Sequence, residues 1–441
     1  MTVHQMVLPT KDEVFALYAR GKLPEAMSVA AKVLLDAKSD TEILNLVAVC
    51  HMRQGNSEQA ISYLQKSLSI NPSHTDANYH LGRLLAGQKR FADAEAAYRK
   101  VIQIRPDCAD AHYNLGHVLA EQKKSVDAEA AFRQSLRINP EHPWANYYLG
   151  RLLAGQKRFA DAESAFRQSL QINPEHAWSH YYLGRLLAGQ KRFEDAKVAY
   201  RKALTIDKED RFGARLSLSV LCHEPLPLRA SESHLGRLYA RRAQFWDQES
   251  QYRGDELVAS VLQEQVLHHE LDILDAGCGT GRVGVRIRKM ARRLDGIDLS
   301  NKMLEKAREK CVYDHIEQGD LEVFMQKHPR QYDAIVCAAT LIHFGDLSSV
   351  FLSAARSLRV NGCFVFTLFS LGENSDGAEV QVHPVDRLEY GGCYAHGKDY
   401  VVRTAKESGF VVELLNSEIH EYMHGKPIMC FVVLLRLHSI C

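Results

Sequence analysis

The chain has 441 residues, of which 46% are hydrophobic and 25% are charged, and its net charge is +1. This length allows two or three domains, and the near-neutral charge excludes the basic excess expected of a nucleic-acid-binding protein. The longest apolar run, at 428–435, is too short to cross a bilayer and is better explained as a buried strand. We therefore expect a globular protein that binds neither nucleic acid nor membrane.

Ten cysteines are scattered along the chain without a CxxC pair or a His/Cys cluster. This pattern argues against a structural metal site and against a disulfide framework, so we expect no bound metal. The first residues, MTVHQMVLPTKDEV, lack the apolar core of a secretory signal peptide. Both observations favour a reducing, cytoplasmic location.

The first half of the chain repeats a pattern of 34 residues. Four near-identical segments begin at Tyr79, Tyr113, Tyr147 and Tyr181, and looser matches extend the frame to about six units over residues 7–210. Each unit predicts a pair of helices, with a glycine where the second helix crosses the first; these glycines are Gly82, Gly116, Gly150 and Gly184. The period, with Leu-Gly, then Ala, an aromatic residue and Pro, resembles the tetratricopeptide repeat. The resemblance implies an all-α solenoid whose curved surface binds protein.

The first helix of each unit carries an aromatic residue and, four positions later, a basic residue, which places both on one helix face. We interpret this face as a candidate surface for an acidic or extended peptide of a protein partner or substrate. The alternative is that the tyrosines pack between helices while the basic groups are solvated. The candidate partner-binding residues are Tyr79, Arg83, Tyr113, Tyr147, Arg151, Tyr181 and Arg185, and His117 takes the basic position in the second of the four segments.

The second half of the chain alternates short apolar runs with helical stretches. A linker is expected at 211–234 and a second domain at 235–441. Strands are expected at 271–277, 294–298, 315–318, 332–339, 363–370, 410–419 and 428–437, and helices at 282–293, 301–310, 346–358 and 398–408. This alternation predicts a doubly wound, Rossmann-like α/β domain with a mostly parallel seven-stranded sheet. Ligands of such folds lie beyond the carboxyl ends of the strands.

The stretch DILDAGCGTGRVG, which follows the first expected strand, can be aligned in two registers. Gly277, Gly279 and Gly281 form a GxGxG turn of the kind used at methyl-donor sites, whereas Gly279, Gly281 and Gly284 form a GxGxxG turn typical of nicotinamide enzymes. The second register begins two residues late after the strand. Asp275 precedes the first register, where its carboxylate can anchor the turn or meet the ammonium of a methyl donor through water. The sequence favours the first register.

Acids also follow the next two expected strands. Asp298 can accept hydrogen bonds from ribose hydroxyls, and Asp320, with Leu321 beside it, can accept one from an adenine amine. The region from about 235 to 437 resembles class I S-adenosylmethionine-dependent methyltransferases, through DAGCGTG, GIDLSNKMLEKA, QGDLEVF and YDAIVCAATLIHF. The whole chain resembles a bacterial family of predicted methyltransferases that carry tetratricopeptide repeats. The resemblance implies S-adenosyl-L-methionine as cofactor, held by Asp275, Gly277, Gly279, Gly281, Asp298, Leu299, Asp320 and Leu321.

Residues further along the chain supply candidates for catalysis. His343 follows the fourth strand, nearest the expected sulfonium, and is the candidate general base; its alternative role is packing. Tyr239 and Tyr252 precede the first strand and are candidates for a segment that closes over the donor. Candidates for the substrate wall are Thr340, Tyr394 and His396.

These features predict a methyltransferase with an O or N acceptor on a small molecule or a protein-borne group. The strand ending CAAT lacks the Asn/Asp-Pro-Pro-Tyr turn used on planar amide or base nitrogens. Two alternatives stay open: a protein-binding repeat scaffold with a non-catalytic methyltransferase fold, and a nicotinamide oxidoreductase.

Overall fold

The computed structural model describes residues 10–36, 39–248, 251–265, 270–371, 379–382, 393–423 and 425–438. The chain divides into two compact units, residues 1–186 and 187–441. Residues 7–9, where the repeats were expected to begin, lie outside the described residues.

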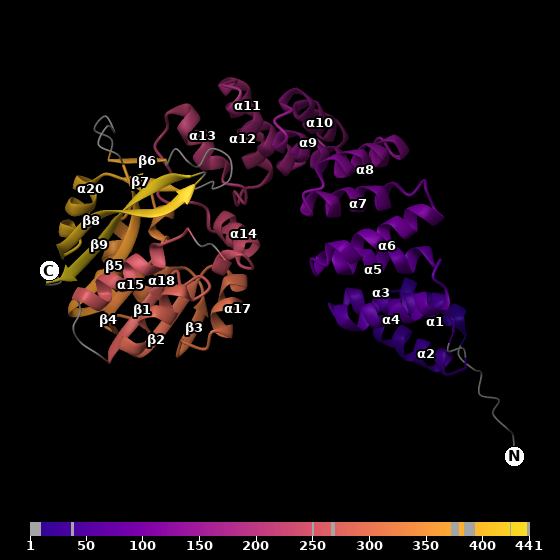
Figure 1. Ribbon diagram of the computed structural model, residues 1–441, viewed down its shortest axis with the longest axis horizontal. Coiled ribbons are helices and arrows are strands. Elements are labelled where there is room, and N and C mark those ends of the chain that lie inside the picture. The colour runs from indigo at the N-terminus through magenta and orange to yellow at the C-terminus, as the bar shows by residue number, and fades with distance from the viewer. Residues whose placement is uncertain are drawn as a thin grey trace, which may run out of the picture. The chain divides into compact units, whose positions relative to one another are not determined.

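The first unit is built from consecutive helices joined by short turns (Figure 1). Its helices are α1 Lys11–Ala19, α2 Leu23–Asp36, α3 Thr41–Arg53, α4 Ser57–Ile70, α5 Thr75–Gly87, α6 Phe91–Ile104, α7 Ala109–Glu121, α8 Ser125–Ile138, α9 Ala145–Gly155, α10 Phe159–Ile172 and α11 Ala177–Gly189, the last of which runs into the second unit. First and second helices of the predicted units alternate in this order. The expected all-α repeat organisation is confirmed.

The repeated glycines allow close helix packing. A Cβ built on Gly116 or Gly150 would lie 2.8 Å from the ring of Phe132 or Phe166, and one on Gly82 would lie 2.9 Å from the ring of Tyr98. Each of these rings is almost completely buried. The aromatic residue of the second helix therefore occupies the space that the glycine of the first helix leaves.

Replacing Gly150 with alanine should lower the stability of the array by about 1–3 kcal/mol, because the Phe166 ring has to move in a packed core. Gly155 lies on the same helix, and a Cβ there meets no atom within 4 Å. Gly155→Ala should leave stability unchanged or raise it slightly, since alanine favours the helix. Thermal unfolding followed by circular dichroism measures both. Equal melting temperatures for the two variants would contradict the packing argument.

The second unit begins with helices α12 Phe193–Ile206, α13 Ala214–Cys222, α14 Glu232–Arg242 and α15 Gly254–Gln265, with the 3₁₀ turn η1 Trp246–Gln248 between the last two. Its strands are β1 Leu271–Ala276, β2 Ala291–Asp298, β3 His315–Gln318, β4 Tyr332–Cys337, β5 Leu358–Ser370, β6 Val380–Val382, β7 Tyr394–His396, β8 Phe410–Met423 and β9 Lys426–Leu437. The remaining elements are α16 Arg282–Ile287, η2 Arg288–Met290, α17 Asn301–Glu309, α18 Leu321–Lys327, η3 Leu341–His343, α19 Ser348–Ser357 and α20 Lys398–Glu407.

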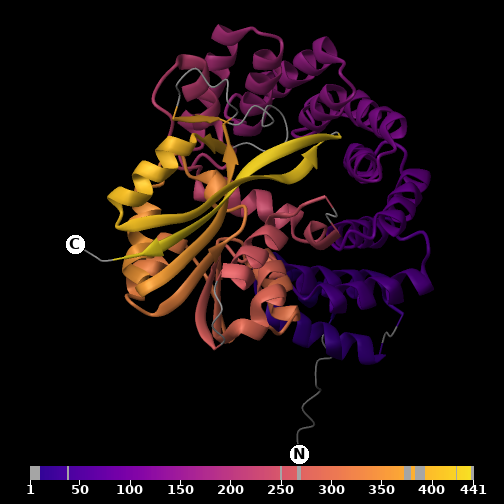
Figure 2. The same cartoon turned by 60° about the vertical axis from the view of Figure 1, so that its left-hand side comes forward.

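These strands form one sheet in the order β3-β2-β1-β4-β5-β7-β6, with β9 paired to both β5 and β8. The pairs from β3 through β5 are parallel, and β9 is antiparallel to β5. Strands β8 and β9 form a long antiparallel hairpin (Figure 2). The predicted doubly wound, mostly parallel sheet is confirmed, and its seven expected strands correspond to β1–β5, β8 and β9.

Helices cover both faces of the sheet because alternate strand residues point to opposite sides. Ile273 packs with Val258 of α15 and Val283 of α16, whereas its neighbour Leu274 belongs to the cluster with Phe351 of α19. All six residues of β1 are buried. Burial on both faces explains the continuous apolar runs 334–337 in β4 and 363–366 in β5.

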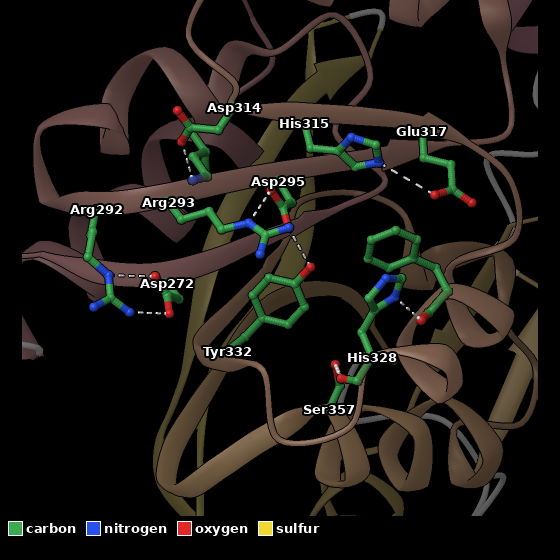
Figure 3. Close-up of polar contacts among 12 residues, drawn as sticks. Asp272, Arg292, Arg293, Asp295, Asp314, His315, Glu317, His328, Tyr332 and Ser357 are labelled. Atoms are coloured by element: carbon green, nitrogen blue, oxygen red, sulfur yellow. Dashed lines mark hydrogen bonds and ion pairs between the residues drawn. The ribbon is translucent and has the colours of Figure 1, made fainter.

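Two local expectations about the sheet need correction. The helix expected at 282–293 ends at Ile287, and β2 begins at Ala291 rather than at 294. Arg292 and Arg293 belong to the strand, where their guanidinium groups pair with Asp272 and Asp295 (Figure 3). The short strands β6 and β7 were not predicted, because three residues carry too little periodicity.

Buried Asp295 shows how the sheet tolerates a charge. Its carboxylate accepts a hydrogen bond from the hydroxyl of Tyr332 at 2.7 Å and pairs with Arg293 at 2.9 Å (Figure 3). A buried carboxylate is tolerated only when such partners replace water. This contact ties β2 to β4 far from the carboxyl ends of the strands.

Candidate functional site

A cavity with about 950 Å³ of empty space, part of it open to solvent, lies at the carboxyl ends of strands β1, β2 and β4. Its walls come from the glycine loop after β1, from Asp298 and its neighbours after β2, and from residues 319–321 after β3. Residues 338–340 and His343, after β4, line it as well. This is the location that a doubly wound sheet predicts for a ligand.

The glycine loop fixes which register faces the cavity. Gly277 and Gly279 line it with φ angles of 79° and 55°, which are unfavourable for residues with a Cβ. A Cβ on Gly284 would instead lie 2.4 Å from the Tyr313 hydroxyl, and one on Gly281 would lie 3.0 Å from the ring of Tyr313. The first two glycines of the GxGxG register therefore border the cavity, whereas the last glycine of the GxGxxG register supports packing.

Asp298 stands at the end of β2 with its carboxylate fixed. One oxygen accepts the backbone N–H of Gly279 at 3.0 Å, and the other accepts that of Ser300 at 2.8 Å. Burial raises the pKa of the Asp298 carboxyl to about 6, against these two hydrogen bonds, which lower it. The side chain both shapes the glycine loop and lines the cavity, together with its neighbour Leu299.

Asp275 does not line the cavity, although it was predicted to help hold the cofactor. It is completely buried, accepts a hydrogen bond from the Tyr313 hydroxyl at 2.7 Å, and is not among the cavity-lining residues. Burial raises the pKa of its carboxyl to about 7, and the charge of Asp298 adds to the rise. Of its two predicted roles, the geometry favours anchoring the turn.

Asp320 lines the cavity beside Leu321, but its carboxylate has several partners. One oxygen caps α18 by accepting the N–H groups of Glu322 and Val323 at 3.0 Å. The other accepts the Arg229 guanidinium at 2.6 Å. An adenine amine bound by Asp320, as predicted, would therefore share the carboxylate with the Arg229 guanidinium.

Arg229 belongs to a cavity wall that the sequence did not indicate. We call residues 227–230 the strap. Its backbone bonds to the chain after η3: Ala230 N–H donates to His343 O at 2.9 Å, and Leu228 O accepts the N–H of Gly345 at 2.8 Å. The expected linker at 211–234 is thus partly built into the wall of the cavity. Its Pro- and Leu-rich sequence is typical of a connector and gives no signal of this role.

An aromatic cluster covers the cavity near His343. The rings of Tyr239 and Tyr252 both pack against Trp246, with centroid distances of 5.7 and 5.3 Å. All three line the cavity. Tyr239 and Tyr252, the residues predicted to close over the donor, thus lie at the cavity wall, whereas Trp246 was not predicted, because no motif surrounds it.

Polar contacts tie this cluster to the glycine loop. Asp247 accepts the hydroxyl of Thr280 at 2.5 Å and pairs with Lys310 at 2.9 Å. Arg282, the first residue of α16, stacks on Tyr252 at 5.1 Å and donates to Trp246 O at 3.3 Å. These contacts join segments far apart in sequence.

His343 is buried and lines the cavity. Its Nε2 lies 2.7 Å from the hydroxyl of Tyr239, and its Nδ1 lies 3.9 Å from Cys393 Sγ. Burial raises the pKa of the Tyr239 hydroxyl, so this residue is a neutral phenol. The predicted base is therefore one half of a hydrogen-bonded Tyr–His pair.

Of the three candidates for the substrate wall, one lines the cavity and two do not. Thr340 lines the cavity and follows Ala339, whose φ of 55° is held by a hydrogen bond from its N–H to Thr367. Tyr394 and His396 are completely buried in β7 and do not line the cavity. The Tyr394 hydroxyl donates to Pro227 O at 2.8 Å, and burial lowers the pKa of His396 to about 4. Their polar side chains gave no sign of burial in the unpredicted strand.

The candidate partner-binding residues of the first unit differ in how far their side chains are buried. The rings of Tyr147 and Tyr181 are almost fully buried, and those of Tyr79 and Tyr113 are half-buried. The guanidinium of Arg151 lies over Tyr147, and that of Arg185 lies over Tyr181. The tyrosines therefore pack, as the alternative reading held, while Arg83 is exposed and Arg151 and Arg185 remain partly accessible.

The described residues contain no group of three or more His, Cys, Asp or Glu side chains that could hold a metal ion. None of their helices has the length and apolar character needed to cross a bilayer.

The fold and the site define a helical repeat array followed by a doubly wound domain with a ligand cavity. The chain matches the methyltransferase domain family over residues 273–362. It matches tetratricopeptide repeat families over residues 14–75, 51–107, 79–143 and 141–209. The chain therefore combines tetratricopeptide repeats with a methyltransferase domain.

Among curated proteins, the chain is similar to the biotin biosynthesis bifunctional protein BioHC of Saccharophagus degradans. They are 27% identical over 249 residues, which is 51% of this chain and 44% of the relative. It is also similar to the ubiquinone biosynthesis O-methyltransferase of Yersinia enterocolitica, with 23% identity over 154 residues, 33% of this chain and 63% of the relative. The chain thus spans less than two thirds of either relative.

The chain is also similar to two solved structures, at low identity. PilF of Pseudomonas aeruginosa is 20% identical with a TM-score of 0.42, covering 48% of this chain and 95% of that one. A SAM-dependent methyltransferase of Methanosarcina mazei is 16% identical with a TM-score of 0.34, covering 41% of this chain and 98% of that one.

Proposed function

We propose that the second unit binds S-adenosyl-L-methionine and transfers its methyl group to an O or N acceptor on a small molecule or a protein-borne group. The repeat array recruits a partner or the substrate. The bound cofactor supplies an electrophilic methyl group on a sulfonium, so the protein has to position an acceptor more than it has to activate one.

The fixed carboxylate of Asp298 is the observation that carries this proposal. Backbone N–H groups hold both of its oxygens at the cavity wall, and each oxygen keeps lone pairs for ribose hydroxyls. A Cβ on Gly279 would meet no atom within 4 Å, so this glycine leaves room for a ligand to approach the backbone, whereas the space beside Gly277 holds Thr340. Leu321 and the shared carboxylate of Asp320 suit an adenine ring at the far end of the cavity.

The geometry of the glycine loop speaks against the nicotinamide alternative. A dinucleotide fingerprint uses its first glycine for the turn, its second for the approach of the backbone to a pyrophosphate, and its third for packing of helix on strand. In that register the second glycine is Gly281, which does not line the cavity, whereas Gly277 and Gly279 do.

The Tyr–His pair suggests how a proton is removed from the acceptor. Because Nε2 of His343 is occupied by the Tyr239 hydroxyl, we infer that His343 acts through that hydroxyl. Tyr239 oxygen accepts the proton of an O–H or N–H acceptor while its own proton passes to Nε2. Cys393 Sγ, close to Nδ1, helps to orient the ring.

Calorimetric titration with S-adenosylhomocysteine, with NADH as the competing ligand, tests the proposal. We expect micromolar binding of S-adenosylhomocysteine and none of NADH. Binding of NADH alone would overturn it in favour of an oxidoreductase. If the folded protein binds neither ligand, the result would favour the alternative function, a protein-binding repeat scaffold with a non-catalytic methyltransferase fold.

A further inference from the structure

The side chain of Tyr313, in the turn between α17 and β3, packs against the glycine loop. A Cβ built on Gly284 would lie 2.4 Å from its hydroxyl, and Cβ atoms on Gly281 and Gly296 would lie 3.0 and 3.1 Å from its ring. These glycines belong to helix α16, to the loop before it and to strand β2. One tyrosine therefore occupies the space that three glycines leave on three neighbouring segments.

The Tyr313 hydroxyl also satisfies a buried carboxyl. It donates to Asp275 Oδ2 at 2.7 Å, whereas Asp275 Oδ1 has no hydrogen-bond partner in the described part of the chain. Burial raises the pKa of the Asp275 carboxyl to about 7, although this hydroxyl and the backbone N–H of Gly284 lower it. A buried acceptor that loses its donor is costly, because no water replaces the donor. The carboxyl of Asp275 therefore depends on this hydroxyl.

Backbone contacts connect this packing to the cavity. The carbonyl oxygen of Ile297 accepts the N–H groups of Gly277 and Cys278 at 2.8 and 2.9 Å. All three residues line the cavity, whereas Tyr313 does not. Ile297 directly follows Gly296, the glycine of β2 on which the Tyr313 ring packs. Tyr313 thus supports the hydrogen-bonded base of the loop without reaching the space of a ligand.

We propose that Tyr313 is a positioning residue, which holds the glycine loop in the conformation that receives the methyl donor but does not touch the donor itself. This inference rests on the donor binding proposed above. Without the hydroxyl, the loop can move and bring water or an N–H group to the unpartnered carboxyl of Asp275. Fewer molecules then keep the binding conformation, and the apparent affinity falls in proportion to that fraction.

A tyrosine with a purely structural role would change stability without changing the affinity of the folded molecules. The same sheet offers a matched case. Tyr332 in β4 donates its hydroxyl to the buried carboxylate of Asp295 at 2.7 Å, far from the carboxyl ends of the strands. Replacing either tyrosine with phenylalanine keeps the ring and removes one bond from a hydroxyl to a buried carboxyl. The two bonds differ in place, and Tyr313 is the tyrosine that packs on the glycine loop.

Calorimetric titration of S-adenosylhomocysteine into the full-length protein compares Tyr313→Phe with Tyr332→Phe below the melting temperatures of both. We expect both variants to melt at a lower temperature than the unmodified protein. Tyr313→Phe should bind at least roughly tenfold more weakly, and Tyr332→Phe should stay within about twofold. Hydrogen exchange followed by mass spectrometry should show faster exchange at residues 277–281 in Tyr313→Phe but not in Tyr332→Phe.

Gly284→Ala tests the same contact if Tyr313→Phe fails to fold. Its Cβ would lie 2.4 Å from the Tyr313 hydroxyl, so it displaces the hydroxyl from Asp275 without changing either residue. Affinity should fall several-fold, whereas Val285→Ala, at an exposed position of the same helix, should leave it unchanged. If the unmodified protein binds S-adenosylhomocysteine and these variants bind it equally tightly, the positioning role is wrong and the donor site stands. If the unmodified protein does not bind, the proposed function fails, and the positioning role fails with it.

Discussion

Replacement of Asp298 by alanine should weaken binding of S-adenosylhomocysteine at least tenfold. The side chain is expected to accept the ribose hydroxyls, and a hydrogen bond to a charged group contributes about 1.5–3 kcal/mol. The same change removes the acceptor for the N–H groups of Gly279 and Ser300, so the glycine loop also loses its support. Calorimetry measures the dissociation constant, and circular dichroism verifies the fold.

The matched control is Glu309→Ala, which removes an exposed carboxylate that pairs only with Lys306 at the end of α17. This variant should bind as the unmodified protein does. If Asp298→Ala keeps full affinity while remaining folded, the proposed position of the ribose is wrong.

The same carboxylate predicts a dependence on pH. Its pKa of about 6 means that it loses its charge as the pH falls below 6, and the ionised form is the better acceptor for hydroxyls. Affinity should therefore be constant at pH 7–8 and decline below pH 6, approaching about tenfold per pH unit. Asp298→Asn should remove most of this decline. A decline that persists in Asp298→Asn, with a midpoint near pH 7, would assign it to Asp275 instead.

Replacement of Gly277 by alanine should abolish donor binding and lower stability by about 2–5 kcal/mol. A Cβ at this position would lie 2.1 Å from Thr340 Oγ1, and its φ of 79° is strained for alanine. The magnitude combines a left-handed residue at about 1–2 kcal/mol with overpacking at about 1–3 kcal/mol. Thermal unfolding and calorimetry measure the two effects.

Gly279→Ala separates strain from steric overlap. Its φ is also positive, at 55°, but a Cβ there meets no atom within 4 Å. It should lose only the part of the stability that comes from strain. The double variant Gly277→Ala/Thr340→Gly should recover stability relative to Gly277→Ala, because it removes the group that collides. A Gly277→Ala protein as stable as Gly279→Ala would show that the contact with Thr340 has no consequence.

Sequence reasoning was most successful where a residue pattern is long or repeated. The 34-residue period predicted the helix pairs, and alternation of apolar runs predicted all seven main strands. The glycine loop and Asp298 were predicted to lie near a ligand because they follow parallel strands, whose carboxyl ends meet at one edge. In the structure they border the same cavity.

The sequence failed where position depends on distant partners. Asp275 faces Tyr313, which is 38 residues away, and no local pattern reveals such a contact. Tyr394 and His396 were predicted for the substrate wall, and their burial was missed because β7 is too short to predict. Trp246 and Arg229 came to the cavity through tertiary contacts alone. Such residues are found only when the surfaces that pack around a cavity are known.

The strap has a consequence for how proteins of this kind can be recombined. A cut at residue 235 would remove Arg229 and the backbone partners of His343 and Gly345, and with them part of the cavity wall. A cut at residue 212 would still remove Asp210, whose carboxylate caps α13 by accepting the N–H of Ala214 at 2.6 Å. An interchangeable methyltransferase domain that keeps these contacts therefore begins upstream of Asp210, and an exchange of one repeat array for another has to leave residues 210–234 with that domain.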